Sequence, residues 1–201
     1  MRSPRTPISG RRSIGVSMLL GGYVNGLRTS AVFLLDCRSH KWHQVTSMTV
    51  PRASPAASVV DGKIYVFGGF RYDKTKNWGE VFDPKTQTWD VLPVLEDEDP
   101  TTSYIQCLIH HSVVVEDKVY LVDACNRTLF YYLPSQCKWG RRNHLSPKTA
   151  KRDWCVIDNL LYSFCHNGRI YWCEREQLDR RDDGLDNGGR FSIATSAGRI
   201  L

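Results

Sequence analysis

The sequence predicts an all-β protein built from a repeated sheet of four antiparallel strands, and three observations carry this prediction. The glycine pairs Gly21-Gly22 and Gly68-Gly69 lie 47 residues apart, and Trp42 and Trp89 are separated by the same interval. Short apolar runs bounded by turn residues recur within each interval, as strands do. Aromatic residues make up 11% of the chain, and large flat side chains suit the space between packed sheets. A period of about 50 residues with four strands per repeat is typical of β-propellers, in which each repeat forms one blade.

The clearest copy of the repeat spans residues 53–93. We expect its strands in this order: Ala56–Val60, Ile64–Phe67, Glu80–Asp83 and Thr88–Leu92. The first two are joined at Asp61-Gly62, a two-residue turn in which glycine adopts a positive φ without steric cost. Gly68-Gly69 ends the second strand, and the missing side chains let the backbone pass close to a neighbouring sheet. Four antiparallel strands with short connections make one blade.

Further copies of the repeat lie at residues 14–47, 105–141 and 152–175. The first contains Gly21-Gly22 and Trp42, and the third ends near Trp139, 50 residues after Trp89. The later copies are less regular, since Asp123-Ala124 stands where the second copy has its glycine pair. The recurrence of tryptophan at the repeat interval favours packing between blades over stacking on a ligand. The sequence therefore predicts a partial propeller of three to four blades.

The segments outside the repeat, residues 1–13 and 176–201, lack a periodic apolar pattern, and we expect both to be poorly ordered tails. The chain has a net charge of +6. Four positive charges precede the first acidic residue, Asp36, in the basic N-terminal tail: Arg2, Arg5, Arg11 and Arg12. Because the basic balance belongs largely to that tail, the repeats show no basic stripe, and we expect no nucleic-acid partner.

The cysteines and the hydropathy pattern bear on the compartment. The seven cysteines are odd in number and form no CxxC pair, which argues against a disulfide framework or a zinc knuckle. No run approaches the ~18 apolar residues of a membrane helix, so we expect no membrane contact. We predict reduced thiols in the cytoplasm or nucleus. The acid-free N-terminus resembles a transit peptide, which leaves import into an organelle as an open alternative.

The sequence contains no recognisable catalytic constellation: GxSxG, GxxxxGK[ST], HExxH and GxGxxG are all missing. His110-His111 is adjacent on a predicted strand, and strand neighbours point to opposite faces, so the two are badly placed to share a metal ion. The acidic run Glu96–Asp99 ends at Pro100 and is typical of a solvated loop. We therefore predict no catalytic residue, no metal site and no cofactor.

The segments GKIYVFGG, VFDP and TQTWDVLP of the second copy resemble the kelch repeat. The longer stretch VPRASPAASVVDGKIYVFGG is similar to the kelch region of plant F-box/kelch-repeat proteins. The resemblance covers residues 14–175 and is strongest over 50–93. In such proteins an F-box, a small helical module, binds a ubiquitin-ligase adaptor while the kelch propeller selects the substrate. Only 13 residues precede the first predicted blade, so we expect the kelch part here without the F-box.

The resemblance also implies a binding face. In kelch proteins, residues just past the double glycine and just after the preceding Pro-Arg line the recognition face, which points here to Arg71, Tyr72 and Ser54. The connection from Phe70 to Trp78 adds a large aromatic residue, and Arg, Tyr and Trp are common interface anchors. An arginine anchor would select an acidic side chain on the partner. An ordinary exposed loop is the alternative.

These observations predict a non-enzymatic protein-interaction module of the kelch type, related to the substrate-recognition components of ubiquitin ligases. Two alternatives stay open: a propeller enzyme with a metal or redox site at the channel mouth, and a truncated remnant without a stable function. Three to four blades fall at or below the low end of the ~4–8 that close a ring. Exposed blade faces and strand edges invite association, so a partner or a second copy would complete the propeller.

Overall fold

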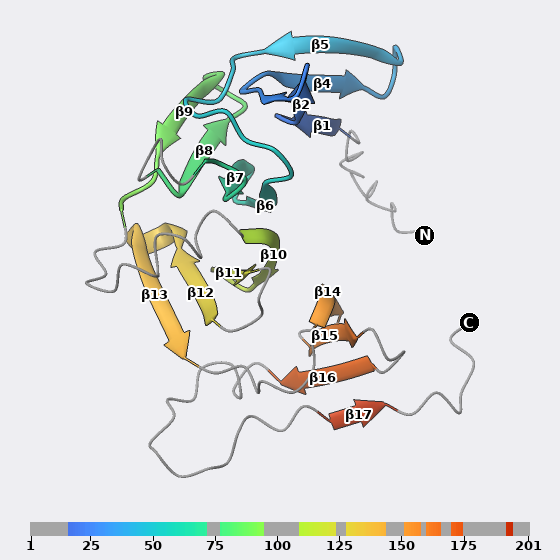
Figure 1. The fold of residues 1–201 in the computed structure, drawn as a ribbon, viewed down its shortest axis with the longest axis vertical. Helices are drawn as coiled ribbons and strands as arrows, with labels where there is room; N and C mark the ends of the chain where they lie inside the picture. Colours follow the sequence, from blue (N-terminus) through green and yellow to red (C-terminus); the bar gives the residue numbers. More distant parts are fainter. Residues whose placement is uncertain are drawn as a thin grey trace, which may run out of the picture.

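The structure is a computed structural model of the 201-residue chain, and it describes residues 16–71, 77–94, 109–123, 128–143, 151–157, 160–165, 170–174 and 192–194. Its strands form four successive antiparallel sheets that follow one another along an open arc (Figure 1). The prediction of an all-β, partial propeller is confirmed. We refer to the four sheets as blades 1 to 4 in chain order.

The blades take their strands consecutively from the sequence. Blade 1 contains β1 (Val16–Leu20), β4 (Val32–Asp36) and β5 (Lys41–Val45). Blade 2 contains β6 (Ala56–Val60), β7 (Lys63–Phe67), β8 (Gly79–Asp83) and β9 (Thr88–Val91). Blade 3 contains β10 (Ile109–Val115), β11 (Lys118–Asp123), β12 (Thr128–Leu133) and β13 (Lys138–Asn143), with the 3-10 turn η1 (Pro134–Gln136) before β13. Blade 4 contains β14 (Lys151–Ile157), β15 (Leu160–Cys165), β16 (Ile170–Glu174) and β17 (Ser192–Ala194).

Blade 2 shows why these residues form these strands. In β6 the buried residues alternate with exposed ones, so Ala56, Ser58 and Val60 face the protein interior. Asp61 and Gly62 connect β6 to β7 with φ values of 50° and 76°, as a type I′ hairpin turn requires. The whole blade is antiparallel, with Val66 paired to both Ala57 and Glu80.

Blade 1 has three strands among the described residues, one fewer than the other blades. Strand β1 corresponds to β7, because Gly21-Gly22 follows β1 as Gly68-Gly69 follows β7. A short additional hairpin, β2 (Tyr23–Val24) and β3 (Leu27–Arg28), comes directly after Gly21-Gly22.

The double glycines lie where one blade meets the next. A Cβ at Gly21 would collide with the backbone carbonyl of Arg52, and one at Gly68 would collide with that of Ile109. Both glycines also have positive φ values, of 62° and 66°. Arg52 precedes the first strand of blade 2 and Ile109 begins that of blade 3, so each glycine permits a close approach to the following blade.

Tryptophans link successive blades at equivalent positions. Trp89 in β9 donates from Nε1 to the carbonyl of Thr46, in the connection that leaves blade 1, over 2.8 Å. Trp139 in β13 donates likewise to the carbonyl of Pro93, in the connection that leaves blade 2, over 2.6 Å. Trp42 holds the corresponding position in blade 1 but is 53% exposed, so it differs from the other two.

Two apolar clusters fill the spaces between blades. One joins blades 1 and 2 around Val32, Met48 and Val66. The larger one joins blades 2 and 3 and is rich in aromatic side chains, including Phe67, Trp78, Phe130 and Tyr132. The core is therefore a series of layers between stacked sheets, as a propeller requires.

Most of the expected tails, residues 1–13 and 176–201, lies outside the described residues. The exception is β17, which pairs with β16 as the fourth strand of blade 4. The described residues include no helix that could cross a membrane.

Candidate functional site

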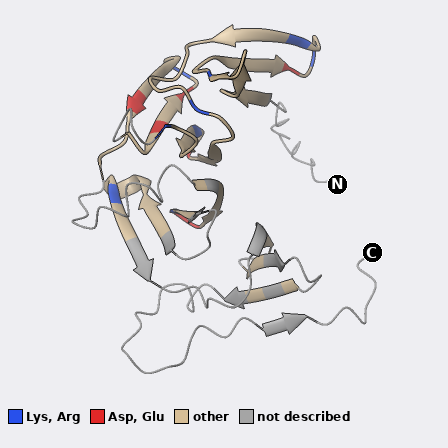
Figure 2. Cartoon of the chain, viewed as in Figure 1, with Lys and Arg blue, Asp and Glu red and all other residues tan. Residues whose placement is uncertain are grey.

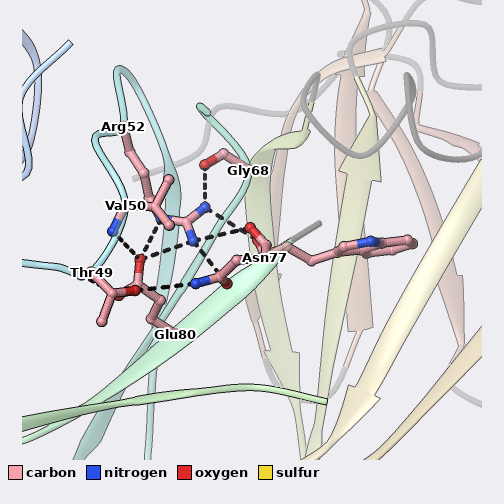
Figure 3. Close-up of polar contacts among 7 residues, drawn as sticks. Thr49, Val50, Arg52, Gly68, Asn77 and Glu80 are labelled. Atoms are coloured by element: carbon pink, nitrogen blue, oxygen red, sulfur yellow. Dashed lines mark hydrogen bonds and ion pairs between the residues drawn. The ribbon is translucent and has the colours of Figure 1, made fainter. Parts of the chain in front are cut away.

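A buried ion pair organises the loops at one end of blade 2. Arg52 and Glu80 are both fully buried, and the Arg52 guanidinium donates to the Glu80 carboxylate from Nε over 3.0 Å (Figure 3). The same carboxylate accepts hydrogen bonds from the backbone N–H and the hydroxyl of Thr49, at 2.6 and 2.5 Å, and from the N–H of Val50. Glu80 therefore fixes the connection that leads from blade 1 into blade 2.

The remaining donors of Arg52 fix the other loop. Nη1 donates to the carbonyls of Gly68 and Trp78, at 2.7 and 3.3 Å, and Nη2 donates to the carbonyl and the side-chain oxygen of Asn77 (Figure 3). The guanidinium also lies 5.7 Å from the centre of the Phe70 ring. Arg52 thus ties both ends of the connection between β7 and β8, residues 68–78, to the connection before β6.

The pairing explains how two charges are tolerated in the interior. Burial lowers the pKa of Arg52 from its ordinary value, and the adjacent Glu80 carboxylate opposes that shift. Every nitrogen of the guanidinium has an acceptor, so the cost of removing the charge from water is offset by hydrogen bonds as well as by the counter-charge. Removal of either partner would leave an uncompensated buried charge.

A backbone hydrogen bond places the segments that carry two of the predicted binding residues side by side. The N–H of Ala53 donates to the carbonyl of Gly69 over 2.8 Å, so residues 52–54 run alongside residues 68–71. Ser54 has a φ of 50° and is exposed, as is Arg71. Tyr72, the third predicted residue, lies outside the described part of the chain.

The β2–β3 hairpin of blade 1 extends the same region. Asn25 and Gly26 form its turn, with φ values of 50° and 78°. The side chains around this turn are apolar and unusually exposed, with exposed fractions of 61% for Tyr23, 58% for Val24 and 71% for Leu27. Large apolar side chains that gather on a surface mark interaction sites.

Arg28 joins the hairpin to the predicted binding residues. Its Nε donates to the carbonyl of Gly69 over 3.0 Å, and its guanidinium lies 5.6 Å from the centre of the Tyr23 ring, its cross-strand neighbour. The hairpin of blade 1 therefore packs beside the loop of blade 2. We call these residues the hairpin face, which wraps around the tip of the hairpin: Tyr23 and Arg28 lie on one side of it, Val24 and Leu27 lie on the other, and Ser54 and Arg71 come from blade 2.

The hairpin face is apolar with a positive rim. In the segments that form it (residues 21–31, 52–55 and 68–71) all the charged side chains are arginines. Figure 2 shows the positions of lysine and arginine along the ribbon in blue. Arg52 is buried in the network, which leaves Arg28 and Arg71 to contribute charge at the surface. Such a surface suits a partner that presents an apolar side chain beside an acidic one.

The structure changes the role of one aromatic residue. The sequence offered Trp78 as part of an exposed connection, but Trp78 is only 2% exposed and packs against Phe130 and Trp139, with ring centres 5.4 and 5.0 Å away. It belongs to the core between blades 2 and 3. The apolar anchors on the surface come instead from the hairpin, and the Asn25-Gly26 turn between Val24 and Leu27 was the sequence signal for it.

Other candidate chemistry finds little support among the described residues. No group of three or more His, Cys, Asp or Glu side chains there could hold a metal ion. His110 and His111 are neighbours on β10, and the register shifts between Ile109 and His111. The acidic run of residues 96–99 lies outside the described ranges.

The geometry defines a class of protein: stacked propeller blades that display loops from neighbouring blades on one shared face. Comparison of the chain with known families matches the kelch-repeat domain described as FKB95 over residues 9–195. The chain therefore belongs to the kelch-repeat family.

Its relatives include proteins of Arabidopsis thaliana that are named as F-box/kelch-repeat proteins. One is 47% identical over 156 residues, which cover 78% of this chain and 37% of the relative. Another is 35% identical over 82% of this chain and 40% of the relative, and a third is 34% identical over 91% and 47%. The chain spans less than half the length of each of these relatives.

Proposed function

We propose that this chain is a protein-interaction module that binds its partner through the hairpin face. The observation that carries the proposal is the cluster of exposed apolar side chains on the β2–β3 hairpin, held by Arg28 against the loop that the Arg52–Glu80 pair fixes. The buried network holds the loops in place, and the apolar side chains of the hairpin are exposed. A binding surface that is ordered in this way before association loses little side-chain or loop entropy when the partner binds.

The names of the relatives suggest the setting in which this face acts. We propose that the chain recognises the substrate in an F-box/kelch type of ubiquitin ligase, in the cytoplasm or nucleus. Cys37, Cys137 and Cys155 are free thiols on the surface, which suits a reducing compartment. The substrate would carry an acidic residue for Arg28 or Arg71 next to an apolar one for the hairpin.

The test compares proteins captured by tagged chains in cells of the source organism. The double variant Tyr23→Ser/Leu27→Ser removes the two most exposed anchors of the hairpin. Val59→Ser is the control, because Val59 is 64% exposed but lies on β6 away from the hairpin. We expect the partner to be lost from the double variant and kept by the control. Equal capture by all three chains would contradict the proposed face.

A second measurement addresses ligation itself. A captured protein that is a substrate should become more abundant and carry less ubiquitin when the chain is removed from the cell. A captured protein whose abundance and ubiquitination do not change would support binding through the hairpin face and contradict the role in ubiquitin ligation.

A further inference from the structure

Arg28 on β3 is held in place by a hydrogen bond from Nε and by a contact with an aromatic ring. Its Nε donates to the carbonyl of Gly69 over 3.0 Å, and its guanidinium lies 5.6 Å from the centre of the Tyr23 ring. The next residue, Thr29, is fixed as well, because its carbonyl accepts from the N–H of Arg52 over 3.1 Å. The backbone and the side chain of Arg28 are therefore both ordered before any partner binds.

The acceptor of the Arg28 hydrogen bond is itself fixed by blade 2. The carbonyl of Gly69 also accepts from the N–H of Ala53 over 2.8 Å. A Cβ at Gly69 would lie 2.6 Å from the carbonyl oxygen of Ala53, so the two segments are in close contact. The neighbouring carbonyl of Gly68 accepts from Nη1 of Arg52 over 2.7 Å. The buried ion pair thus sets the position of Arg28 through Gly68 and Gly69.

The outer edge of the Arg28 guanidinium carries donors that the described part of the chain does not use. A guanidinium has five N–H groups, one on Nε and two on each Nη. Among the residues that the structure describes, only the Nε group of Arg28 has a hydrogen-bond acceptor. Arg52 differs, because its Nε, Nη1 and Nη2 all find acceptors inside the protein. Arg28 can therefore offer its two Nη atoms to another molecule.

We infer that Arg28 selects the acidic group of the partner, with its two Nη atoms donating to the oxygens of an Asp or Glu carboxylate while Nε stays on Gly69. The inference rests on the proposed function, and it identifies Arg28 rather than Arg71 as the residue that recognises the acid. Planar two-point contact with a carboxylate is a geometry that arginine favours. Because Arg28 is already ordered, the contact costs little side-chain entropy.

Tyr23 adds an apolar surface beside the carboxylate site. It is the cross-strand neighbour of Arg28, so both side chains lie on the same side of the hairpin. Tyr23 is 61% exposed although the Arg28 guanidinium lies near its ring. An apolar group next to the acidic residue of the partner can pack on this ring. The site therefore fits an acidic side chain with an apolar neighbour, presented at the junction of blades 1 and 2.

This geometry gives arginine a role that lysine cannot take. Lysine has the same charge but ends in a single nitrogen on a flexible stem. An ammonium that donates to Gly69 cannot also present a planar pair of donors to a carboxylate. Arg28→Lys therefore removes the two-point contact and keeps the net charge of the hairpin face.

The test uses a library of random peptides displayed on phage and selected on the purified full chain. We expect the selected peptides to carry Asp or Glu beside an apolar residue. One of them is then measured by fluorescence anisotropy against the wild type, Arg28→Lys and the matched control Arg71→Lys, both as selected and with its acid changed to the amide. For the wild type and the control, the amide should weaken binding about tenfold or more, since a hydrogen bond to a charged group is lost. For Arg28→Lys the loss should be less than about threefold, because the contact is already missing.

The comparison separates recognition from a structural effect of the substitution, because it measures the coupling between position 28 and the acid of the peptide. An equal effect of the amide on all three chains, or an effect that disappears in Arg71→Lys instead, would overturn the inference and leave the proposed function in place. Wild-type selections without Asp or Glu would overturn it too. If the wild type selects no more peptide than Tyr23→Ser/Leu27→Ser does, the proposed function itself is contradicted. Circular dichroism of each variant checks that the sheets are retained.

Discussion

Blades 2 and 3 place different chemistry at matching positions of the repeat. When the blades are aligned on Trp89 and Trp139, Glu80 of blade 2 corresponds to Phe130 of blade 3. Arg52 corresponds to Ile109, because the carbonyl of each lies against the first glycine of the preceding blade's glycine pair. Blade 2 therefore holds a buried ion pair where blade 3 holds two buried apolar side chains.

The difference follows from what lies around each pair. The Arg52–Glu80 pair bonds to backbone groups of two irregular connections, at Thr49, Val50, Gly68, Asn77 and Trp78. Ile109 and Phe130 lie within strands whose backbone groups pair with their neighbours, although the register of β10 shifts just after Ile109. Replacing an ion pair by apolar side chains is often neutral in proteins, but here the pair also bonds to the N–H groups of Thr49 and Val50 and to the carbonyl of Gly68 in these connections. The buried ion pair therefore occurs in blade 2, the blade that carries the proposed binding loops.

The largest expected loss of stability comes from a change at the junction between the two blades, where Gly68 of blade 2 lies close to the backbone of Ile109 in blade 3. Gly68→Ala places a methyl group on the carbonyl of Ile109 and holds an alanine at a φ of 66°. We expect a loss of more than about 4 kcal/mol in the free energy of unfolding, measured by urea denaturation. Gly62→Ala is the control, with a φ of 76° and nothing within 4 Å of the new methyl group. It should cost about 1–2 kcal/mol. Equal effects would contradict the packed junction.

The next effect breaks the polar pair in blade 2. Arg52→Met leaves the Glu80 carboxylate buried without its counter-charge, and we expect a loss of about 3–5 kcal/mol by the same measurement. The matched change in blade 3, Ile109→Met, conserves apolar volume and should cost less than about 1.5 kcal/mol. If the two variants were equally stable, the ion pair would not hold the loops as we describe.

A double variant that gives blade 2 the apolar side chains of blade 3 compares the two blades more directly. Arg52→Ile/Glu80→Phe installs the side chains of blade 3 in blade 2 and removes both buried charges. It also removes the partners of the N–H groups of Thr49 and Val50 and of the carbonyl of Gly68, whereas the carbonyl of Trp78 keeps the N–H of Gly68. We expect the double variant to remain about 2 kcal/mol less stable than wild type, because buried unpaired groups are costly. If the double variant were as stable as the wild type, the apolar pair could replace the ion pair in blade 2, which would contradict this account.

The smallest effect concerns a turn that blade 3 builds differently. Asp83 accepts a hydrogen bond from the N–H of Lys85, which lowers the pKa of Asp83 below its ordinary 3.8. Blade 3 has Leu133 here, followed by η1. A carboxylate whose pKa is lowered in the folded state stabilises the fold at pH values above its ordinary pKa. That stabilisation is lost as the pH falls through the folded-state pKa. Asp83→Ala should therefore lower the urea midpoint slightly at pH 7 and leave it unchanged near pH 2. A difference that persists near pH 2 would contradict the ionic origin.

The sheets could be predicted from the sequence because they depend on local patterns. The Asp61-Gly62 turn, the glycine pairs and the intervals between tryptophans each reflect a repeated local requirement of the backbone or the packing. Arg52 and Glu80 could not be predicted as a pair, because they are 28 residues apart and no spacing rule joins a strand to the connection before it.

The proposed binding face was predictable in part. Ser54 and Arg71 were assigned from the kelch resemblance, and the structure places their segments side by side. The hairpin was overlooked although Asn25-Gly26 between two apolar residues is a strong turn signal. The burial of Trp78 depends on Phe130 and Trp139, which come from the next blade, so only the tertiary structure could reveal it.

The radial stacking of blades is the central claim, and a designed cross-link tests it most directly. The hydroxyls of Ser58 on β6 and Ser112 on β10 lie 2.8 Å apart, between neighbouring blades. Oxidation of Ser58→Cys/Ser112→Cys should give a disulfide between positions 58 and 112, found by mass spectrometry of the digested chain. Ala57→Cys/Ser112→Cys should not give the corresponding link, since Ala57 points to the other face of β6. A link formed equally in both variants, or in neither, would contradict the stacked arrangement.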